Sequence, residues 1–123
     1  MRRLALSLVL LAAVPGAAVA QEKQNFVTPQ PSDVMGSSLV GADVRNRGGE
    51  TIGEIEDVII ANRSTIRGVI VSVGGFLGMD EHYVAIDPAA LDLRREGDDW
   101  QVTLDATKDQ LRAAPQVDYR GRR

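Results

Sequence analysis

Residues 50–61, which read ETIGEIEDVIIA, decide the fold because they predict one long and bent β-strand. β-branched residues are typical of strands, and apolar side chains at alternate positions mark one buried face. In this stretch the alternation changes parity between Ile52 and Ile55. One extra residue near Gly53 accounts for the change as a β-bulge, which bends a strand and suits a small closed barrel better than a flat sheet.

Short apolar runs separated by turn residues predict further strands on both sides of this stretch. Each run is rich in Val, Ile or Leu, and each turn contains Gly, Asn, Asp or Ser. The predicted order is a strand at 40–45, a glycine turn at 46–49, the long strand at 50–61, a polar turn at 62–65, a strand through Val69, Val71 and Val73, a strand at 82–87, and a hairpin in which 91–93 and 100–104 flank a turn at 96–99. The sequence therefore predicts an all-β domain.

The last predicted element is a short C-terminal helix. Thr107 and Gln110 have the spacing of a capping box, and Pro115 ends the helix after Ala114. We expect an antiparallel β-barrel of five or six strands, about the size of an SH3 domain, with Leu111 of this helix packed against it. The predicted core consists of Leu39, Val44, Ile55, Val58, Ile60, Val69, Val71, Val73, Val84, Ile86, Leu91, Leu93, Trp100, Val102, Leu104 and Leu111.

The N-terminal residues have the pattern of an export signal. Arg2 and Arg3 precede an apolar run at 4–14, and Ala18-Val19-Ala20 is a small-x-small cleavage motif. This order predicts a signal peptide over residues 1–20, cleavage after Ala20 and a periplasmic mature chain. The run is shorter than the ~20 residues that a membrane-spanning helix needs, so we expect no membrane span in the mature chain. The remaining divisions that we predict are a flexible leader at 21–37, the barrel domain at 38–117 and a basic tail at 118–123.

The composition argues against several classes of function. A chain of 123 residues has room for one small domain, and the absence of Cys excludes disulfides, thiolate metal sites and cysteine nucleophiles. Without residues 1–20, 12 Lys and Arg remain against 17 Asp and Glu, and aromatic residues make up only 4% of the chain. Nucleic-acid recognition depends on basic patches and stacking aromatic rings, so we expect no nucleic-acid partner. We also expect no cofactor.

Five segments, taken in order, resemble the PRC-barrel family. They are GSSLVGADV at 36–44, GETIGEIEDVII at 49–60, VIVSVGGFLG at 69–78, YVAI at 83–86 and ATKDQLRAAP at 106–115. The family takes its name from a β-barrel shared by the H subunit of the purple bacterial photosynthetic reaction centre and a ribosome maturation factor. The chain is most similar to small, exported, stand-alone members from proteobacteria. The resemblance implies a barrel used as an interaction module, with no catalytic residues to carry over.

The glycine-rich segment Gly74-Gly75-Phe76-Leu77-Gly78 is the predicted partner-binding site. Its two large apolar side chains either plug one end of the barrel or project as an apolar tip for another protein or a second copy, as in a homodimer. The loop is not a phosphate cradle, because no Lys followed by Ser or Thr comes after it.

Two function classes stay open. We favour a non-catalytic periplasmic module for protein interaction or scaffolding, because no motif marks a nucleophile and we expect no enzyme activity. The alternative is a small-ligand or metal-sensing barrel built on Asp80, Glu81 and His82, since a histidine beside carboxylates has the ligand types that such a site uses. The acidic residues of the long strand, Glu50, Glu54, Glu56 and Asp57, place part of their charge on one exposed face, which either keeps the protein soluble or attracts a basic partner.

Overall fold

The computed structural model describes residue 12, residues 25–74 and residues 81–120. It divides the chain into two units, Met1–Pro31 and Ser32–Arg123. In the first unit, residues 25–30 adopt neither helix nor strand, and the side chains of Phe26 and Val27 are exposed. In the described part of the chain, every helix is too short or too polar to cross a membrane.

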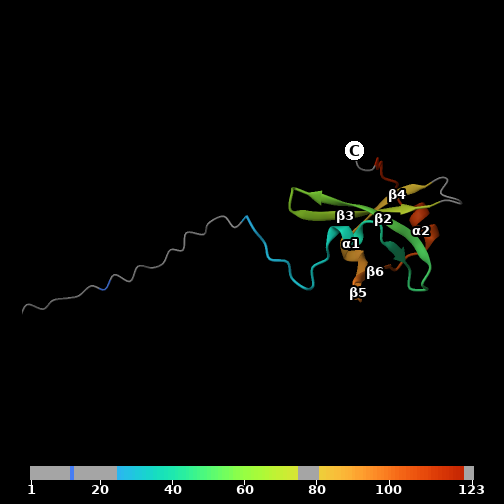
Figure 1. Cartoon of the computed structure of the whole chain (residues 1–123). Helices are drawn as coiled ribbons and strands as arrows, with labels where there is room; N and C mark the ends of the chain where they lie inside the picture. The colour runs from blue at the N-terminus through green and yellow to red at the C-terminus, as the bar shows by residue number, and fades with distance from the viewer. Residues whose placement is uncertain (1–11, 13–24, 75–80, 121–123) are drawn as a thin grey trace, which may run out of the picture. The chain divides into compact units, whose positions relative to one another are not determined.

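The second unit is mostly β-structure, as the sequence predicts. Within the described residues it contains six strands, which form one sheet, and short helices (Figure 1). The elements are α1 (Gly36–Leu39), β1 (Asp43–Arg45), β2 (Thr51–Ala61), β3 (Thr65–Val73), β4 (His82–Ile86), the 3₁₀ helix η2 (Pro88–Ala90), β5 (Leu91–Glu96), β6 (Asp99–Leu104) and α2 (Lys108–Ala113).

The strand order in the sheet is β4-β3-β2-β1-β6-β5, which places β4 and β5 at its two ends. The predicted purely antiparallel arrangement is wrong at one position, because β1 and β6 pair in parallel. Parallel neighbours need a long connection between them, and the segment from β2 to β5 supplies it. The other pairings that the structure describes are antiparallel.

The pairings of β2 shift register at three points, and the first shift is the predicted bulge near Gly53. Val44 pairs with Gly53 and Arg45 with Thr51, so Ile52 has no partner in the β1 register. Ile52 and Ile55 are both buried in consequence, although three positions separate them. A second shift leaves Glu56 outside the register with β3, and a third leaves Arg67 of β3 outside the register with β2.

Two of the predicted turns form tight hairpins. Asn62 and Arg63 have φ values of 50° and 66°, and the Ser64 amide donates to the Ala61 carbonyl at 3.1 Å. Asn62, Arg63 and Ser64 form the loop between the paired residues Ala61 and Thr65. Two consecutive positive φ angles are typical of tight hairpin turns, because their twist matches that of antiparallel strands. Gly97, with φ of 62°, lies in the predicted turn between β5 and β6.

Most of the predicted core is confirmed. The predicted residues that are buried are Val44, Ile55, Val69, Val71, Val73, Val84, Val102, Leu104 and Leu111, and Leu39, Ile86, Leu91 and Leu93 pack against them. The prediction that Ile60 belongs to the core is wrong, because its side chain is 64% exposed. Val58 and Trp100 are only half-buried. β2 and β3 extend beyond the short β1, so the apolar pattern of β2 continues past the end of the core.

The predicted first strand begins later than expected. The Val40 amide donates to the Gly36 carbonyl at 3.0 Å and closes the turn of α1, and Gly41 follows with φ of 91°. β1 therefore starts only at Asp43, and the predicted leader overlaps the first residues of this helix.

Helix α2 begins with the predicted capping box. The Thr107 hydroxyl accepts from the Gln110 amide at 3.1 Å, and Gln110 Oε1 accepts from the Thr107 amide at 2.9 Å. Leu111 is buried and fixes the helix against the sheet. In Figure 1 the helix lies at the opposite end of the sheet from the turn between β2 and β3.

Candidate functional site

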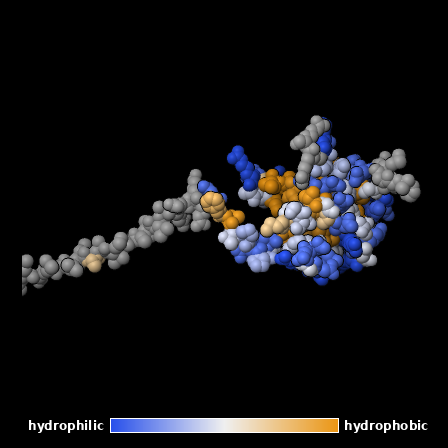
Figure 2. All heavy atoms as spheres, in the orientation of Figure 1, coloured by the Kyte–Doolittle hydropathy of each residue, from blue (hydrophilic) through white to orange (hydrophobic). Residues whose placement is uncertain are grey.

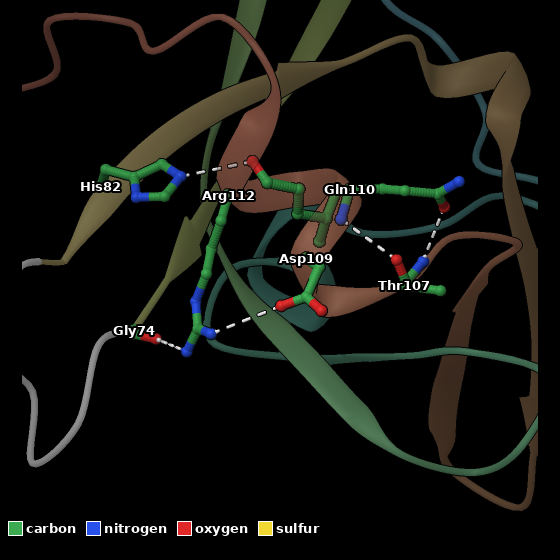
Figure 3. A network of polar contacts seen from close by, with 7 residues as sticks. Gly74, His82, Thr107, Asp109, Gln110 and Arg112 are labelled. Carbon is green, nitrogen blue, oxygen red and sulfur yellow. Dashed lines mark hydrogen bonds and ion pairs between the residues drawn. The ribbon is translucent and has the colours of Figure 1, made fainter.

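The predicted partner-binding segment, Gly74 to Gly78, lies outside the described residues except for Gly74. The Gly74 carbonyl accepts a hydrogen bond from Arg112 Nη2 at 3.4 Å, and Arg112 Nη1 lies 3.7 Å from Asp109 Oδ1 (Figure 3). Helix α2 thus contacts the chain where the predicted segment begins. The alternative roles of Phe76 and Leu77, as plug or as apolar tip, stay predictions.

His82 starts β4, and its ring points toward α2. Its Nε2 lies 3.3 Å from the Leu111 carbonyl oxygen, and the tautomer with the proton on Nε2 donates a hydrogen bond there (Figure 3). Asp80 lies outside the described residues, and Glu81 is exposed. No cluster of three His, Asp or Glu side chains able to hold a metal ion occurs in the part of the chain that the structure covers. In this arrangement the His82 imidazole connects β4 to helix α2.

The end of the β2–β3 hairpin carries an exposed apolar pair. Ile60 and Ile66 are opposite one another across the two strands, and they are 64% and 53% exposed. They lie on the core-facing side, because Ile60 is two positions beyond Val58, which pairs with the buried Val69. Figure 2 shows hydrophobic atoms gathered over this hairpin, whereas hydrophilic atoms cover much of the remaining visible surface of the unit.

Cations flank this apolar pair. Arg63 in the turn and Arg67 in β3 are both exposed. The sequence contains no Asp or Glu between positions 58 and 79, although the chain as a whole carries more acidic than basic residues. We define the hairpin end as Ile60, Arg63, Ile66 and Arg67. Its surface is apolar and positively charged.

On the opposite face of the sheet, four side chains form a row across β1 to β4. Asp43 pairs with Glu54, Glu54 with Ser72, and Ser72 with Tyr83. Directly opposite residues share a face, and Ser72 alternates with the buried core residues of β3, so this row points away from the core. The buried Ser72 hydroxyl donates to Glu56 Oε1 at 2.9 Å and lies 3.3 Å from the Glu54 carbonyl oxygen.

The carboxylates along this row repel one another. Burial raises the pKa of Glu54 above its ordinary value, and the charges of Glu56, Asp43 and Glu81 raise it further. Ion pairs join Arg47 to Asp105, Arg94 to Asp92, Arg112 to Asp109 and Arg120 to Asp118, and these pairs include none of the four carboxylates. The row is therefore a negative surface without an internal counter-charge in the described region.

The chain after α2 extends this negative surface into a groove along β4. The Val117 amide donates to the Tyr83 carbonyl at 2.9 Å, and the rings of Tyr83 and Tyr119 meet edge to face with centroids 5.2 Å apart. The Tyr119 hydroxyl donates to Asp57 Oδ2 at 2.9 Å, which fixes the segment over β2. The resulting tyrosine groove has a volume of about 390 Å³ and is lined by Glu81, Tyr83, Gln116, Val117, Asp118 and Tyr119.

Nearby carboxylates affect the Tyr83 hydroxyl in the same groove. Burial raises the pKa of Tyr83, and the carboxylates of Glu81 and Glu56, together with a hydrogen bond to Glu81, raise it further. The phenol is therefore neutral at physiological pH, and its ring provides an apolar wall beside a carboxylate. Aromatic walls with adjacent negative charge are a suitable environment for cationic groups.

A larger groove of about 540 Å³ lies between α1, β1 and β6. Its lining includes Ser37, Ser38, Asp43, Asp99 and Trp100. Because Trp100 borders this groove, its ring is only half-buried and not part of the core. Arg95 lies over the ring at 5.9 Å from its centroid.

Sequence reasoning missed both the hairpin end and the tyrosine groove. It placed Ile60 in the core because the apolar pattern of β2 gives no sign of where the neighbouring strands end. It assigned residues 118–123 to a basic tail, whereas Asp118 and Tyr119 line the groove. Two sequence features could have indicated these surfaces. The predicted second strand is longer than the predicted first strand, which points to the hairpin end, and an aromatic residue stands within a polar terminus, which points to the groove.

Comparison with known proteins gives one result. A search of curated proteins finds no match. The family model for the PRC-barrel domain matches residues 32–111, from just before α1 into α2 and across all six described strands. Because this match covers well over half of the 123 residues, the chain belongs to the PRC-barrel domain family.

Proposed function

We propose that the chain is exported, that residues 1–20 are removed after Ala20, and that the mature chain is a non-catalytic protein-interaction module of the periplasm. The arginines, apolar run and cleavage motif at the N-terminus support export. Membership of the PRC-barrel domain family supports a small β-module, and we propose that the bent sheet wraps into a closed barrel. The bulges of β2 favour such wrapping because each one bends the strand.

The observation that carries the proposal is the exposed pair of Ile60 and Ile66 at the hairpin end. Covering most of both side chains would contribute about 2–4 kcal/mol, before the cost of association is subtracted. The pair lies on a projecting two-stranded ribbon, whereas small-molecule ligands bind in concave pockets. A surface of this shape fits another polypeptide better than a small ligand.

Site-specific photocrosslinking tests this proposal. A photoreactive phenylalanine analogue replaces Ile66 in the full-length chain, and the matched control carries it at Arg94, an exposed position on the edge strand β5. We expect a polypeptide adduct from position 66 in the periplasmic fraction and none from position 94. Equal labelling from both positions, or no adduct from position 66 in a folded protein, would contradict an interaction role for the hairpin end.

A further inference from the structure

We propose that the hairpin end of one copy of this chain binds in the tyrosine groove of a second copy. The inference rests on the proposed function, because it assigns a partner to the same hairpin end. The two surfaces lie at different positions on the chain and differ in charge. Each surface supplies the chemistry that the other lacks.

The hairpin end supplies apolar side chains and positive charge. Ile60 and Ile66 are exposed side by side, and Arg63 and Arg67 lie next to them. Because no carboxylate occurs between positions 58 and 79, this segment contains no acidic residue that could neutralise the two guanidinium groups locally. Its partner must therefore combine an apolar contact with negative charge.

The tyrosine groove offers that combination. Tyr83, Tyr119 and Val117 provide apolar walls, and Glu81 stands at the rim. Glu54 and Glu56 continue the negative charge along the sheet, whereas the rim carboxylate of Asp118 already pairs with Arg120 at 3.4 Å. Repulsion among these carboxylates decreases when a cation approaches, and each arginine of the hairpin end gains a charged acceptor.

The two surfaces cannot meet within one copy. Ile66 and Ser72, the partner of Tyr83 in the sheet, are six positions apart along β3, which corresponds to about 20 Å. A contact between different patches of identical chains can be reciprocal, which gives a two-fold dimer, or one-way, which gives a ring or an open chain of copies. The mature chain should therefore form dimers or larger assemblies as its concentration rises.

Two complementary variants of the exported full chain test this geometry. The hairpin variant is Ile66→Ser with Arg67→Glu, and the groove variant is Glu54→Lys with Glu81→Lys. All four positions are exposed, so both variants should keep the far-ultraviolet circular dichroism of the wild type. The hairpin variant should keep the melting temperature of the wild type, and the groove variant should melt no lower than the wild type because it loses two carboxylates that repel their neighbours. Arg94→Glu, a charge reversal on β5, is the matched control.

Light scattering then reports the mass of each sample at increasing concentration. We expect the wild type and Arg94→Glu to grow in mass, and we expect each double variant alone to stay monomeric. An equimolar mixture of the two variants should form dimers and nothing larger, because only one intact hairpin end and one intact groove remain in each pair. High salt should weaken all of these assemblies, since exposed charges are screened.

Several results would overturn the inference. If the groove variant alone still associates like the wild type, the hairpin ends contact one another or another surface. If the mixture stays monomeric, the two surfaces do not meet. If the purified wild type is monomeric while position 66 crosslinks to a different polypeptide in the periplasm, the proposed function stands and self-association is wrong. A monomer without any adduct from position 66 contradicts both proposals.

Discussion

A single methyl group added at Gly53 tests how closely β2 approaches β3 at its first bulge. A Cβ atom at this position would lie 2.6 Å from Val71 Cγ1 and 2.8 Å from the backbone carbonyl oxygen of Ser72. Val71 is fully buried in the core, and the Ser72 carbonyl belongs to a central strand. Neither neighbour can move away without disturbing well-packed atoms, so the clash must be relieved by a backbone shift.

We expect Gly53→Ala to lower the free energy of unfolding by about 3 kcal/mol, at the upper end of the usual cost of overpacking. That loss is a large share of the ~5–15 kcal/mol that stabilises a typical domain. For a domain of about 100 residues it corresponds to a fall in melting temperature of roughly 12–24 °C.

Urea denaturation followed by circular dichroism measures this difference. The control is Gly36→Ala in helix α1, where an added Cβ meets nothing within 4 Å. It should match the wild type or gain up to about 1 kcal/mol, because alanine restricts the unfolded chain more than glycine does. If Gly53→Ala unfolds at the same urea concentration as Gly36→Ala, the close approach of β2 to β3 is not real and the reasoning fails.

Three further predictions use the same unfolding assay. Ile55→Ala should lower the free energy of unfolding by about 2–5 kcal/mol because the Ile55 side chain is fully buried, whereas Ile60→Ala should change it by no more than about 0.5 kcal/mol. Equal losses for the two variants would mean that Ile60 is covered in the folded protein. Thr107→Ala should cost about 1 kcal/mol by removing the capping box of α2, and an unchanged midpoint would show that the cap is unimportant. The pKa of Glu54 is higher in the folded than in the unfolded chain. The protonated carboxyl group therefore stabilises the fold below the unfolded-state pKa, and this contribution is lost as the pH rises through the folded-state pKa. Glu54→Gln should therefore raise the melting temperature at neutral pH but not in acid, and a lower melting temperature at neutral pH would contradict the repulsion described above.

Local patterns predicted the elements of this fold well. The capping box of Thr107 and Gln110, the turn at Asn62 and Arg63, and the bulge near Gly53 all depend on residues close together in sequence. Each has a backbone requirement that few residue types meet, so the sequence identifies it directly.

Features that depend on distant neighbours were not predictable in the same way. The exposure of Ile60 depends on how far the adjacent strands extend beside β2, and the place of Tyr119 depends on the path of the chain after α2. The parallel pairing of β1 with β6 leaves no mark in either short strand. The same limit applies to the tyrosine groove, because it forms only when residues 116–119 meet β4.

The parallel pairing of β1 and β6 also has a consequence for the order of folding. The β2–β3 and β5–β6 hairpins close short loops, so they can form early and independently. The β1–β6 pairing joins Val44 to Val102, about 58 positions apart, in the middle of the sheet. Closing so long a loop is entropically expensive, and contacts of high sequence separation slow folding. We therefore expect the β1–β6 pairing to form last and to set the folding rate, and a chain lacking β6 leaves β5 without the strand that joins it to β1.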